Sequence, residues 1–356
     1  MTTITGWMMK EPNKPFEKES FEAPALKEGE ALVEVAGCGV CHTDISFSYL
    51  GVKTRKQPPL ILGHEISGKV IEVAEGGADA DASLKGKNVL VPAVLPCGVC
   101  SACRNDRRRI CSAQIMPGND RHGGFATHVA VPARYICPIP DEVLASHELW
   151  ELSIVSDAVT TPFQAVKRSR LNAGDLAINI GVGGIGVHGV QVAKGAGGKV
   201  IAMDIDDVKL EVARTAGADE VINIKGLSGK EIKGKVKEAA KKLDAPKTLW
   251  KIFETSGTKP GQETAFGLMG FGTTLAIVGF TMDKVEARLS NLMAFDAEMF
   301  GIWGCDPVLY PECLDWLAKG KIQVKPFVEK HSLDEINEVF EAAHHGKLQK
   351  RAVLVP

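Results

Sequence analysis

Four cysteines lie close together in the first third of the sequence, and their spacing can hold a metal ion. They are Cys97, Cys100, Cys103 and Cys111, separated by two, two and seven residues. Four thiolates in such a run can surround one tetrahedral zinc ion and leave no coordination position open, which is the pattern of a structural site. The alternatives are an iron–sulfur cluster, which also uses four thiolates, and free cysteines. In a long cytosolic chain, closely spaced cysteines more often bind metal than form disulfides.

A glycine-rich loop has the composition needed to bind a dinucleotide. It follows an apolar run that begins at Leu176, and residues with helical spacing come after it. Gly181 would allow a tight turn, Gly183 would let the backbone approach a pyrophosphate, and Gly186 would let the helix lie close on the strand. The helix N-terminus then offers free N–H groups to the phosphates. The full loop is Gly181, Val182, Gly183, Gly184, Ile185 and Gly186.

An acidic residue lies where a bound ribose would need it. Asp204 ends the next expected strand, eighteen residues after Gly186, and would accept hydrogen bonds from a ribose diol. Asp206 and Asp207 follow, so a 2′-phosphate would meet several negative charges, which favours NAD over NADP. Because strand, turn, helix and acid agree, we expect NAD binding. The alternative is a structural turn with no ligand.

The elements that must position these residues fall into two groups, and 356 residues suggest two domains. The first part is rich in short strand patterns and turns, as in Ala31–Ala36 and Gly68–Val73. From Leu176 to about Gly279, strands and helices alternate as they do in a doubly wound parallel sheet. The lysine-rich stretch Lys225–Leu243 predicts a helix with one solvated face. Further helices are expected at Pro311–Lys319 and Ser332–His345, and a closing strand at Arg351–Pro356.

Composition and charge argue against several classes of protein. A hydrophobic fraction of 45% and a charged fraction of 24% are those of an ordinary globular protein. A net charge of −2 gives no reason to expect binding to nucleic acid or to a membrane surface. No apolar run is long enough to span a bilayer, and the first residues lack the basic and apolar regions of a signal peptide. We therefore expect a cytoplasmic protein that binds neither nucleic acid nor a membrane.

A second set of metal-binding residue types is spread along the chain. Cys41 lies in Gly39-Val-Cys-His-Thr-Asp44, and His64 lies in Gly63-His-Glu65. Taken alone, a free cysteine is usually a core residue, and a lone histidine is usually structural. Together with the four-cysteine run and the glycine loop, these motifs resemble the zinc-dependent alcohol dehydrogenases of the medium-chain dehydrogenase/reductase superfamily.

This resemblance covers essentially the whole chain and implies an α/β protein with two domains. Residues 1–157 and 302–356 would form a β-rich, GroES-like catalytic domain with a structural zinc lobe near 95–113. Residues 158–301 would form a Rossmann domain that binds NAD on a doubly wound parallel sheet. The family commonly forms homodimers or homotetramers, and Thr274–Gly279 and the segment around Trp303 are candidate surfaces for this pairing.

The resemblance also assigns roles at a catalytic zinc site. Cys41 and His64 would bind a second zinc ion, and Asp44 would orient His64 through its other ring nitrogen. Asp157 occupies the third ligand position, where the family usually has cysteine. A carboxylate donates less electron density than a thiolate, so the metal would be a stronger Lewis acid. Ligation by Asp157 directly, ligation through water, and approach of the nearby Glu65 carboxylate all stay open.

Proton transfer and cofactor contacts complete the implied site. Thr43 would hydrogen-bond the substrate hydroxyl and pass its proton toward the cofactor ribose. In some relatives a histidine five residues after the ligand cysteine ends this relay; here that position is Ser46, so the proton would leave through water or another group. The remaining cofactor contacts would be Thr161 near the nicotinamide, Val278, Lys209 at the adenosine ribose and Arg351 at the pyrophosphate.

The implied chemistry is oxidation of an alcohol with two zinc ions per chain. Zinc with an exchangeable position lowers the pKa of a bound hydroxyl, and hydride then passes to the nicotinamide. Trp7–Pro12, Pro117–Phe125, Val278–Met282 and Leu289–Phe295 resemble members that oxidise a cyclic secondary allylic alcohol carried as a CoA thioester in anaerobic aromatic degradation. Arg107–Arg109 is either a solvated basic turn or a contact for such an anionic substrate.

Three other interpretations stay open at this point. The chain can be another alcohol, polyol, threonine or aryl-alcohol dehydrogenase of the same superfamily. It can add hydride to the conjugated double bond of an enone or enoyl thioester, a 1,4 rather than a 1,2 transfer. It can also be a non-catalytic dinucleotide-binding protein, although such a scaffold would not need Cys41, Thr43, Asp44 and His64 together.

Overall fold

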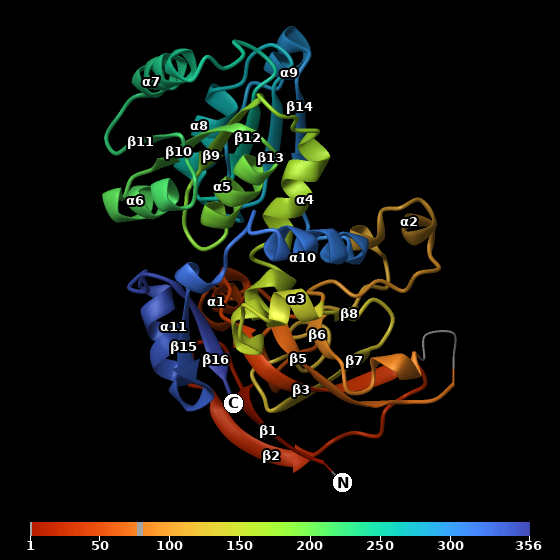
Figure 1. Cartoon of the computed structure of the whole chain (residues 1–356). Helices are drawn as coiled ribbons and strands as arrows, with labels where there is room; N and C mark the ends of the chain where they lie inside the picture. Colours follow the sequence, from red (N-terminus) through yellow and green to blue (C-terminus); the bar gives the residue numbers. More distant parts are fainter. Residues whose placement is uncertain (1, 77–80) are drawn as a thin grey trace. The chain divides into compact units, whose positions relative to one another are not determined.

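The computed structural model describes residues 2–76 and 81–356 and divides the chain into two compact units (Figure 1). The first unit comprises Met1–Thr160, Gly304–Ala318 and Gln323–Pro356, and the second comprises Thr161–Trp303 and Lys319–Ile322. The chain thus returns to the first unit after forming most of the second. The first crossing lies at the start of helix α4 (Thr160–Ser169).

Two mainly antiparallel sheets form the first unit within the described residues. One sheet has the strand order β2–β1–β4; the other has the order β15–β16–β3–β5–β6–β8, with β7 also paired to β3. Apolar residues of β1, β3 and β5 share one buried cluster with residues of the C-terminal segment. The strands are β1 Thr3–Met9, β2 Glu17–Glu22, β3 Glu30–Gly39, β4 Leu60–Ile61, β5 Glu65–Val73, β6 Asn88–Val91, β7 His128–Pro132, β8 Cys137–Pro138, β15 Val328–Ser332 and β16 Arg351–Val355.

The helices of the first unit are short, and several of them carry candidate site residues at their ends. The α-helices are α1 His42–Tyr49, α2 Ser101–Arg104, α3 Asp141–Leu144, α10 Tyr310–Ala318 and α11 Ile336–His344. The 3-10 helices are η1 Ala82–Leu84, η2 Arg108–Ile110, η3 Leu149–Ser156, η4 Pro307–Leu309, η5 Lys325–Phe327 and η6 Leu333–Glu335.

A parallel sheet forms the centre of the second unit. Its strand order is β11–β10–β9–β12–β13–β14, and each neighbouring pair is parallel. The five residues of β9 are all buried, as expected for a central strand covered on both faces. The strands are β9 Leu176–Ile180, β10 Lys199–Asp204, β11 Glu220–Asn223, β12 Lys251–Glu254, β13 Thr274–Ile277 and β14 Glu298–Gly301.

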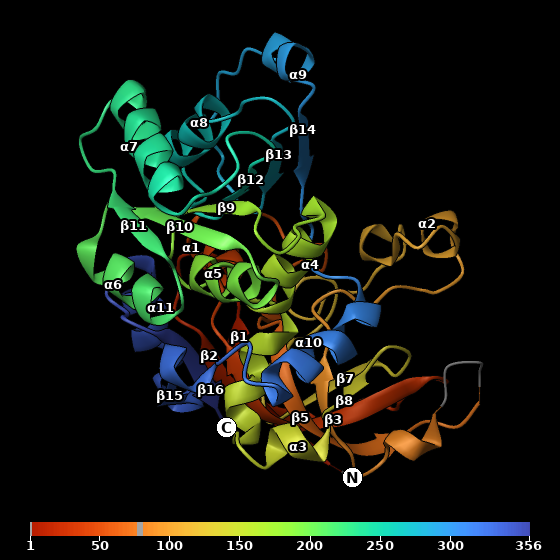
Figure 2. The same cartoon turned by 45° about the horizontal axis from the view of Figure 1, so that its top comes forward.

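Helices cover both faces of this parallel sheet (Figure 2). Helices α5 and α6 pack side by side against β9, β10 and β11, while α7 and α8 pack together on the other face. The expected lysine-rich helix is α7, whose apolar residues Ile232 and Val236 are buried while most of its lysines are exposed. The helices are α5 Gly186–Gly195, α6 Asp207–Thr215, α7 Gly229–Lys242, α8 Lys259–Gly267 and α9 Ser290–Phe295.

This sheet confirms the predicted α/β class with a doubly wound domain. The strand order changes direction at β9, which has β10 on one side and β12 on the other. Ligands of open α/β sheets bind beyond the carboxyl ends of the strands at such a switch point. The glycine loop follows β9 directly, so its position in the topology is that of a nucleotide site.

Candidate metal centres and cofactor site

Helix α1 begins directly after Cys41, and its first turn carries a buried acid. Cys41 is the N-cap residue and has extended backbone angles (φ −102°, ψ 153°). The Asp44 carboxylate accepts hydrogen bonds from the backbone N–H groups of Cys41 and Gly63, each at 3.1 Å. One carboxylate therefore joins the segment that carries Cys41 to the segment that carries His64.

His64 is buried, and Asp44 fixes its orientation. The Nδ1 atom of His64 lies 3.3 Å from Oδ1 of Asp44, while Nε2 faces Oδ2 of Asp157 at 3.6 Å. Burial lowers the pKa of His64, but the charges of Asp44 and Cys41 and hydrogen bonds to both carboxylates outweigh it, and the pKa is well above its ordinary value. A carboxylate behind one ring nitrogen is the arrangement that presents the other nitrogen to a metal ion.

Asp157 completes a compact group of donor atoms. It follows η3, and its Oδ2 lies 3.8 Å from the sulfur of Cys41. One donor atom from each of Cys41, His64, Glu65 and Asp157 lies within 4.8 Å of the others. Tetrahedral zinc with its usual bond lengths separates its ligand atoms by roughly 3.3–3.8 Å. A thiolate, an imidazole and a carboxylate at these distances therefore fit one zinc ion and leave a fourth position for an exchangeable ligand.

Glu65 belongs to the same group but has a cationic partner. Its Oε2 accepts a hydrogen bond from Nε of Arg351 at 2.7 Å, and its Oε1 accepts one from Nη2. Burial raises the pKa of Glu65 to about 7, although the guanidinium opposes this shift. Arg351 is predicted to contact a pyrophosphate, and nothing in the sequence indicates this ion pair. Because Arg351 engages both Glu65 oxygens, we take Cys41, His64 and Asp157 as the candidate ligands.

Thr43, the expected relay residue, and Ser46, which stands where some relatives end the relay with histidine, differ in their surroundings. Thr43 is half-buried, and its hydroxyl lies 3.7 Å from the sulfur of Cys41. Ser46 is buried, and its hydroxyl donates to the backbone carbonyl of His42 at 2.8 Å. The Ser46 hydroxyl is thus turned onto its own helix, so the described contacts give it no link to Thr43.

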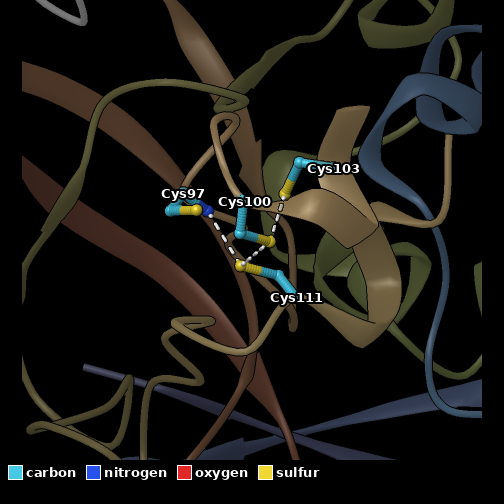
Figure 3. A group of neighbouring side chains, drawn as sticks. All are labelled: Cys97, Cys100, Cys103 and Cys111. Atoms are coloured by element: carbon cyan, nitrogen blue, oxygen red, sulfur yellow. Dashed lines mark hydrogen bonds between the residues drawn. The ribbon is translucent and has the colours of Figure 1, made fainter. Parts of the chain in front are cut away.

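The four-cysteine run forms a second cluster (Figure 3). The sulfur of Cys100 lies 3.5 Å from that of Cys103 and 3.7 Å from that of Cys111. All four sulfur atoms lie within 4.8 Å of one another. Zinc–sulfur bonds of 2.3 Å in a tetrahedron give sulfur–sulfur distances of roughly 3.8 Å, so the set fits one zinc ion with no open position.

Backbone N–H groups already favour thiolates in this cluster. Hydrogen bonds from the backbone of Cys103 and Ser112 lower the pKa of Cys100 to about 5. The backbone N–H groups of Cys97 and Ala113 approach the sulfur of Cys111, each at 3.3 Å. Burial has the opposite effect at Cys103 and raises its pKa to about 12. A bound cation would remove this conflict, because it stabilises all four thiolates together.

The arginine run in this lobe does not act as one solvated patch. Arg109 is buried, and Arg108 lies 3.7 Å from Asp306 and 2.7 Å from Asp106. Arg107 is exposed. Of the three, Arg107 alone has the exposure that a contact with an anionic substrate needs.

The glycine loop has the steric properties that its sequence predicts. Gly181 has φ +79°, and a Cβ on it would lie 2.5 Å from the Cα of Ser256. A Cβ on Gly186 would lie 1.9 Å from the carbonyl oxygen of Gly181, whereas one on Gly183 would meet nothing within 4 Å. The loop is braced by Thr255, whose hydroxyl donates to the Gly181 carbonyl at 2.5 Å. Gly184 and Ile185 complete the loop, and Ile185 is the N-cap of α5.

Asp204 lies at the carboxyl end of β10 and is held against this loop. Its Oδ2 accepts a hydrogen bond from Val182 N–H at 2.8 Å, and its Oδ1 accepts from Ile205 and Asp206 at 2.8 and 3.2 Å. These bonds fix the carboxylate where β9 and β10 end. A cofactor that presents a ribose diol there fits the donor and acceptor pattern better than one that presents a 2′-phosphate.

The other expected cofactor residues are scattered over the second unit. Lys209 is exposed on α6, Thr161 is buried in the first turn of α4, and Val278 is half-buried just after β13. No short motif marks Thr255, so its contact with the glycine loop could not be predicted from the sequence. Within the described part of the chain, no helix is long and apolar enough to cross a membrane.

Comparisons with known proteins agree with this geometry. Residues 27–141 match the model of the alcohol dehydrogenase GroES-like domain, and residues 184–319 match that of the zinc-binding dehydrogenases. An alcohol dehydrogenase of Geobacillus stearothermophilus is 33% identical over 98% of this chain and 97% of its own length. The crystal structure of the alcohol dehydrogenase from Aeropyrum pernix has a TM-score of 0.85 and 29% identity, covering 99% of this chain and 100% of that one. The alcohol dehydrogenase of Thermotoga maritima shares the fold, with a TM-score of 0.87, 21% identity and full coverage of both chains.

A GroES-like unit, a Rossmann unit and a Cys–His–Asp centre define an oxidoreductase of the alcohol dehydrogenase type. The chain belongs to the zinc-dependent alcohol dehydrogenase family of the medium-chain dehydrogenase/reductase superfamily. The predictions of family, fold class and enzyme class made from the sequence are confirmed.

Proposed function

We propose that this enzyme oxidises 6-hydroxycyclohex-1-ene-1-carbonyl-CoA to the 6-oxo product, with NAD as hydride acceptor and two zinc ions per chain. The observation that carries the zinc chemistry is the convergence of Cys41, His64 and Asp157 within one metal-sized space. In the balanced reaction, the carbinol carbon loses a hydride to NAD and the hydroxyl loses a proton to solvent.

The residues of the chain have distinct roles in this proposal. Zinc at the Cys41, His64 and Asp157 site would lower the pKa of the substrate hydroxyl. Asp44 holds the His64 ring through Nδ1, and the same carboxylate ties together the two ligand segments. Thr43 would hydrogen-bond the substrate hydroxyl and take up its proton while passing its own hydroxyl proton to water, which carries it to solvent. Glu65 keeps its ion pair with Arg351, which holds the two side chains beside the metal site without adding net charge.

NAD is the proposed cofactor because the loop after β9 supplies what a pyrophosphate and a ribose need. Gly183 leaves room for a phosphate close to the backbone, and Asp204 supplies the acceptor for a ribose diol. Lys209, Val278, Thr161 and Arg351 stay predicted cofactor contacts. The second zinc ion, at Cys97, Cys100, Cys103 and Cys111, would stabilise the lobe without taking part in the reaction.

The choice of substrate rests on the sequence segments that resemble CoA-thioester dehydrogenases. Arg107 is an exposed cation that would pair with the negatively charged CoA. A simpler alcohol is the second candidate, because the Geobacillus relatives are named alcohol dehydrogenases. Conjugate hydride addition to an enoyl thioester is a third possibility, and it differs in the carbon that exchanges hydride.

Metal analysis of purified variants tests the zinc assignments. The wild type should hold two zinc ions per chain, and His64→Ala should hold one and keep its fold. Its turnover should fall by roughly a hundred- to a thousandfold or more, the loss found on removing a main charge-stabilising group in other enzymes. Cys103→Ser should lose the other zinc ion and unfold at lower temperature. Full activity in His64→Ala would refute the catalytic zinc site.

A screen of alcohols for NAD reduction tests the substrate. We expect turnover with cyclic allylic alcohols carried as CoA thioesters and little with the free alcohols. Turnover of simple alcohols, with none of the thioesters, would reject the CoA proposal and favour the second candidate. Run in reverse with deuterated NADH, the reaction should label the carbinol carbon; label at a ring alkene carbon would indicate conjugate addition.

A further inference from the structure

Tyr310 is a fully buried side chain that lies next to the candidate catalytic centre in the fold but has no role in the chemistry described so far. It begins α10, in the segment Gly304–Ala318 that returns to the first unit. Its hydroxyl donates a hydrogen bond to the backbone carbonyl of Ser156, 154 residues earlier in the sequence. Nothing in the local sequence around either residue predicts this pairing.

The acceptor of this hydrogen bond belongs to the peptide that joins Ser156 to Asp157. A peptide unit is planar, so fixing the carbonyl of Ser156 also fixes the N–H and the Cα position of Asp157. Asp157 itself ends η3 with φ −147° and ψ −60°, outside the helical angles of the preceding residues. The direction in which the Asp157 carboxylate points therefore depends on the contacts that hold the Ser156–Asp157 peptide.

Other contacts around this peptide are weaker or act on a different atom. Ala93 N–H approaches both the Ser156 carbonyl and the Tyr310 hydroxyl at 3.4 Å. The Ser156 hydroxyl donates to the carbonyl of Ile66 at 2.8 Å and so ties the residue to β5, close to His64 and Glu65 in the chain. The Tyr310 hydroxyl is thus the strong donor to the carbonyl that sets the plane.

We propose that Tyr310 is a positioning residue for the catalytic metal, which acts by holding the Ser156–Asp157 peptide so that the Asp157 carboxylate faces Cys41 and His64. This inference rests on the proposed role of Asp157 as a zinc ligand. Tyr310 touches neither substrate nor cofactor in this role. Its loss weakens the metal site because the carboxylate then has to be ordered when zinc binds.

Chelator competition on the fully zinc-loaded enzyme tests this proposal without relying on activity. Tyr310→Phe keeps the ring and removes only the hydroxyl, so we expect the fold and the four-cysteine zinc to be retained. The zinc ion at the catalytic site should dissociate at about tenfold lower chelator concentration, as found for other residues that orient metal ligands. Tyr49→Phe is the matched control, since it makes the same chemical change at a half-buried hydroxyl that faces Glu341.

A double-mutant cycle with Asp157→Ala separates this proposal from a general effect on stability. Asp157→Ala alone should weaken the catalytic zinc site, and adding Tyr310→Phe should then cause no further loss. Unchanged zinc affinity in Tyr310→Phe, or an equal tenfold loss in the Asp157→Ala background, would overturn the role of Tyr310. A wild-type enzyme with only the four-cysteine zinc would instead refute the proposed function itself.

Discussion

His122 shows how one partly buried side chain can make the stability of the first unit depend on pH. Its Nδ1 accepts a hydrogen bond from the backbone N–H of Ile61 at 3.1 Å, which only a ring unprotonated at that nitrogen can do. Burial, together with the charges of Lys56 and Arg121, lowers its pKa to about 4. The unfolded chain has a histidine pKa of about 6.5. The stabilisation is therefore complete above pH 6.5 and is lost as the pH falls toward 4.

Replacing His122 by glutamine should reduce this dependence on pH. The full shift corresponds to roughly 3 kcal/mol, which we discount because the ring is partly exposed to solvent. We expect the wild type to lose about 1 kcal/mol more than His122→Gln between pH 7 and pH 5. Urea unfolding at both pH values measures the difference, with His345→Gln as an exposed control. Parallel losses in wild type and His122→Gln would show that this histidine does not couple folding to protonation.

Residue types could be predicted from the sequence more readily than their distant partners. The four cysteines of the lobe lie within fifteen residues, so their spacing alone indicated one site. Cys41, His64 and Asp157 could be joined only through the family resemblance, because nothing local relates them. Glu65 and Arg351 are 286 residues apart, and their ion pair depends on β16 lying in the same sheet as β5. Such pairs follow from the tertiary fold, which no short motif encodes.

The strand–loop–helix element from β9 to α5 was predictable because its requirements are local. A tight turn, a close helix and an open backbone each depend on one glycine and on its immediate neighbours. The structure separates these requirements at two positions. Gly186 has the carbonyl of Gly181 where a Cβ would be, while Gly183 faces open space. Gly186 is therefore needed for the loop and helix to form. Gly183 is needed only to leave space beside the backbone for a ligand.

Alanine at these two glycines should produce different defects. Gly183→Ala should leave the unfolding temperature unchanged and weaken NAD binding by tenfold or more, because the methyl group occupies the proposed phosphate position. Gly186→Ala should destabilise the second unit by about 1–3 kcal/mol, because the loop must move to avoid overlap. Thermal unfolding and NAD titration by calorimetry distinguish the two. Normal NAD affinity in a well-folded Gly183→Ala variant would show that the cofactor phosphate does not bind beside this glycine.

At the scale of the molecule, exposed apolar side chains lie in the chain near β14, which is at one edge of the parallel sheet of the second unit. The sequence predicts Thr274–Gly279 as a pairing surface, but that prediction is wrong for its strand. Strand β13 lies between β12 and β14 and is largely buried, so it has no free edge. Strand β14 is the terminal strand of the sheet. Exposed apolar side chains in or near the segment that leads to it are Phe271, Phe280, Met282, Leu289, Met293, Met299 and Trp303.

These exposed side chains predict that the enzyme is a homodimer or homotetramer that buries this face of the second unit. Leu289 and Met293 lie at the start and within α9, with 62% and 78% of their surface exposed. Burying two such side chains in an interface contributes about 3 kcal/mol or more per subunit, so replacing both by glutamate should weaken assembly by at least roughly a hundredfold. Sedimentation velocity should then show smaller particles for Leu289→Glu/Met293→Glu than for the wild type at the same concentration. Val208→Glu, at an exposed apolar residue on α6, is the control and should assemble normally.

A monomeric wild type would contradict the prediction of an oligomer. An assembly that tolerates both glutamates would instead place the interface elsewhere on the chain.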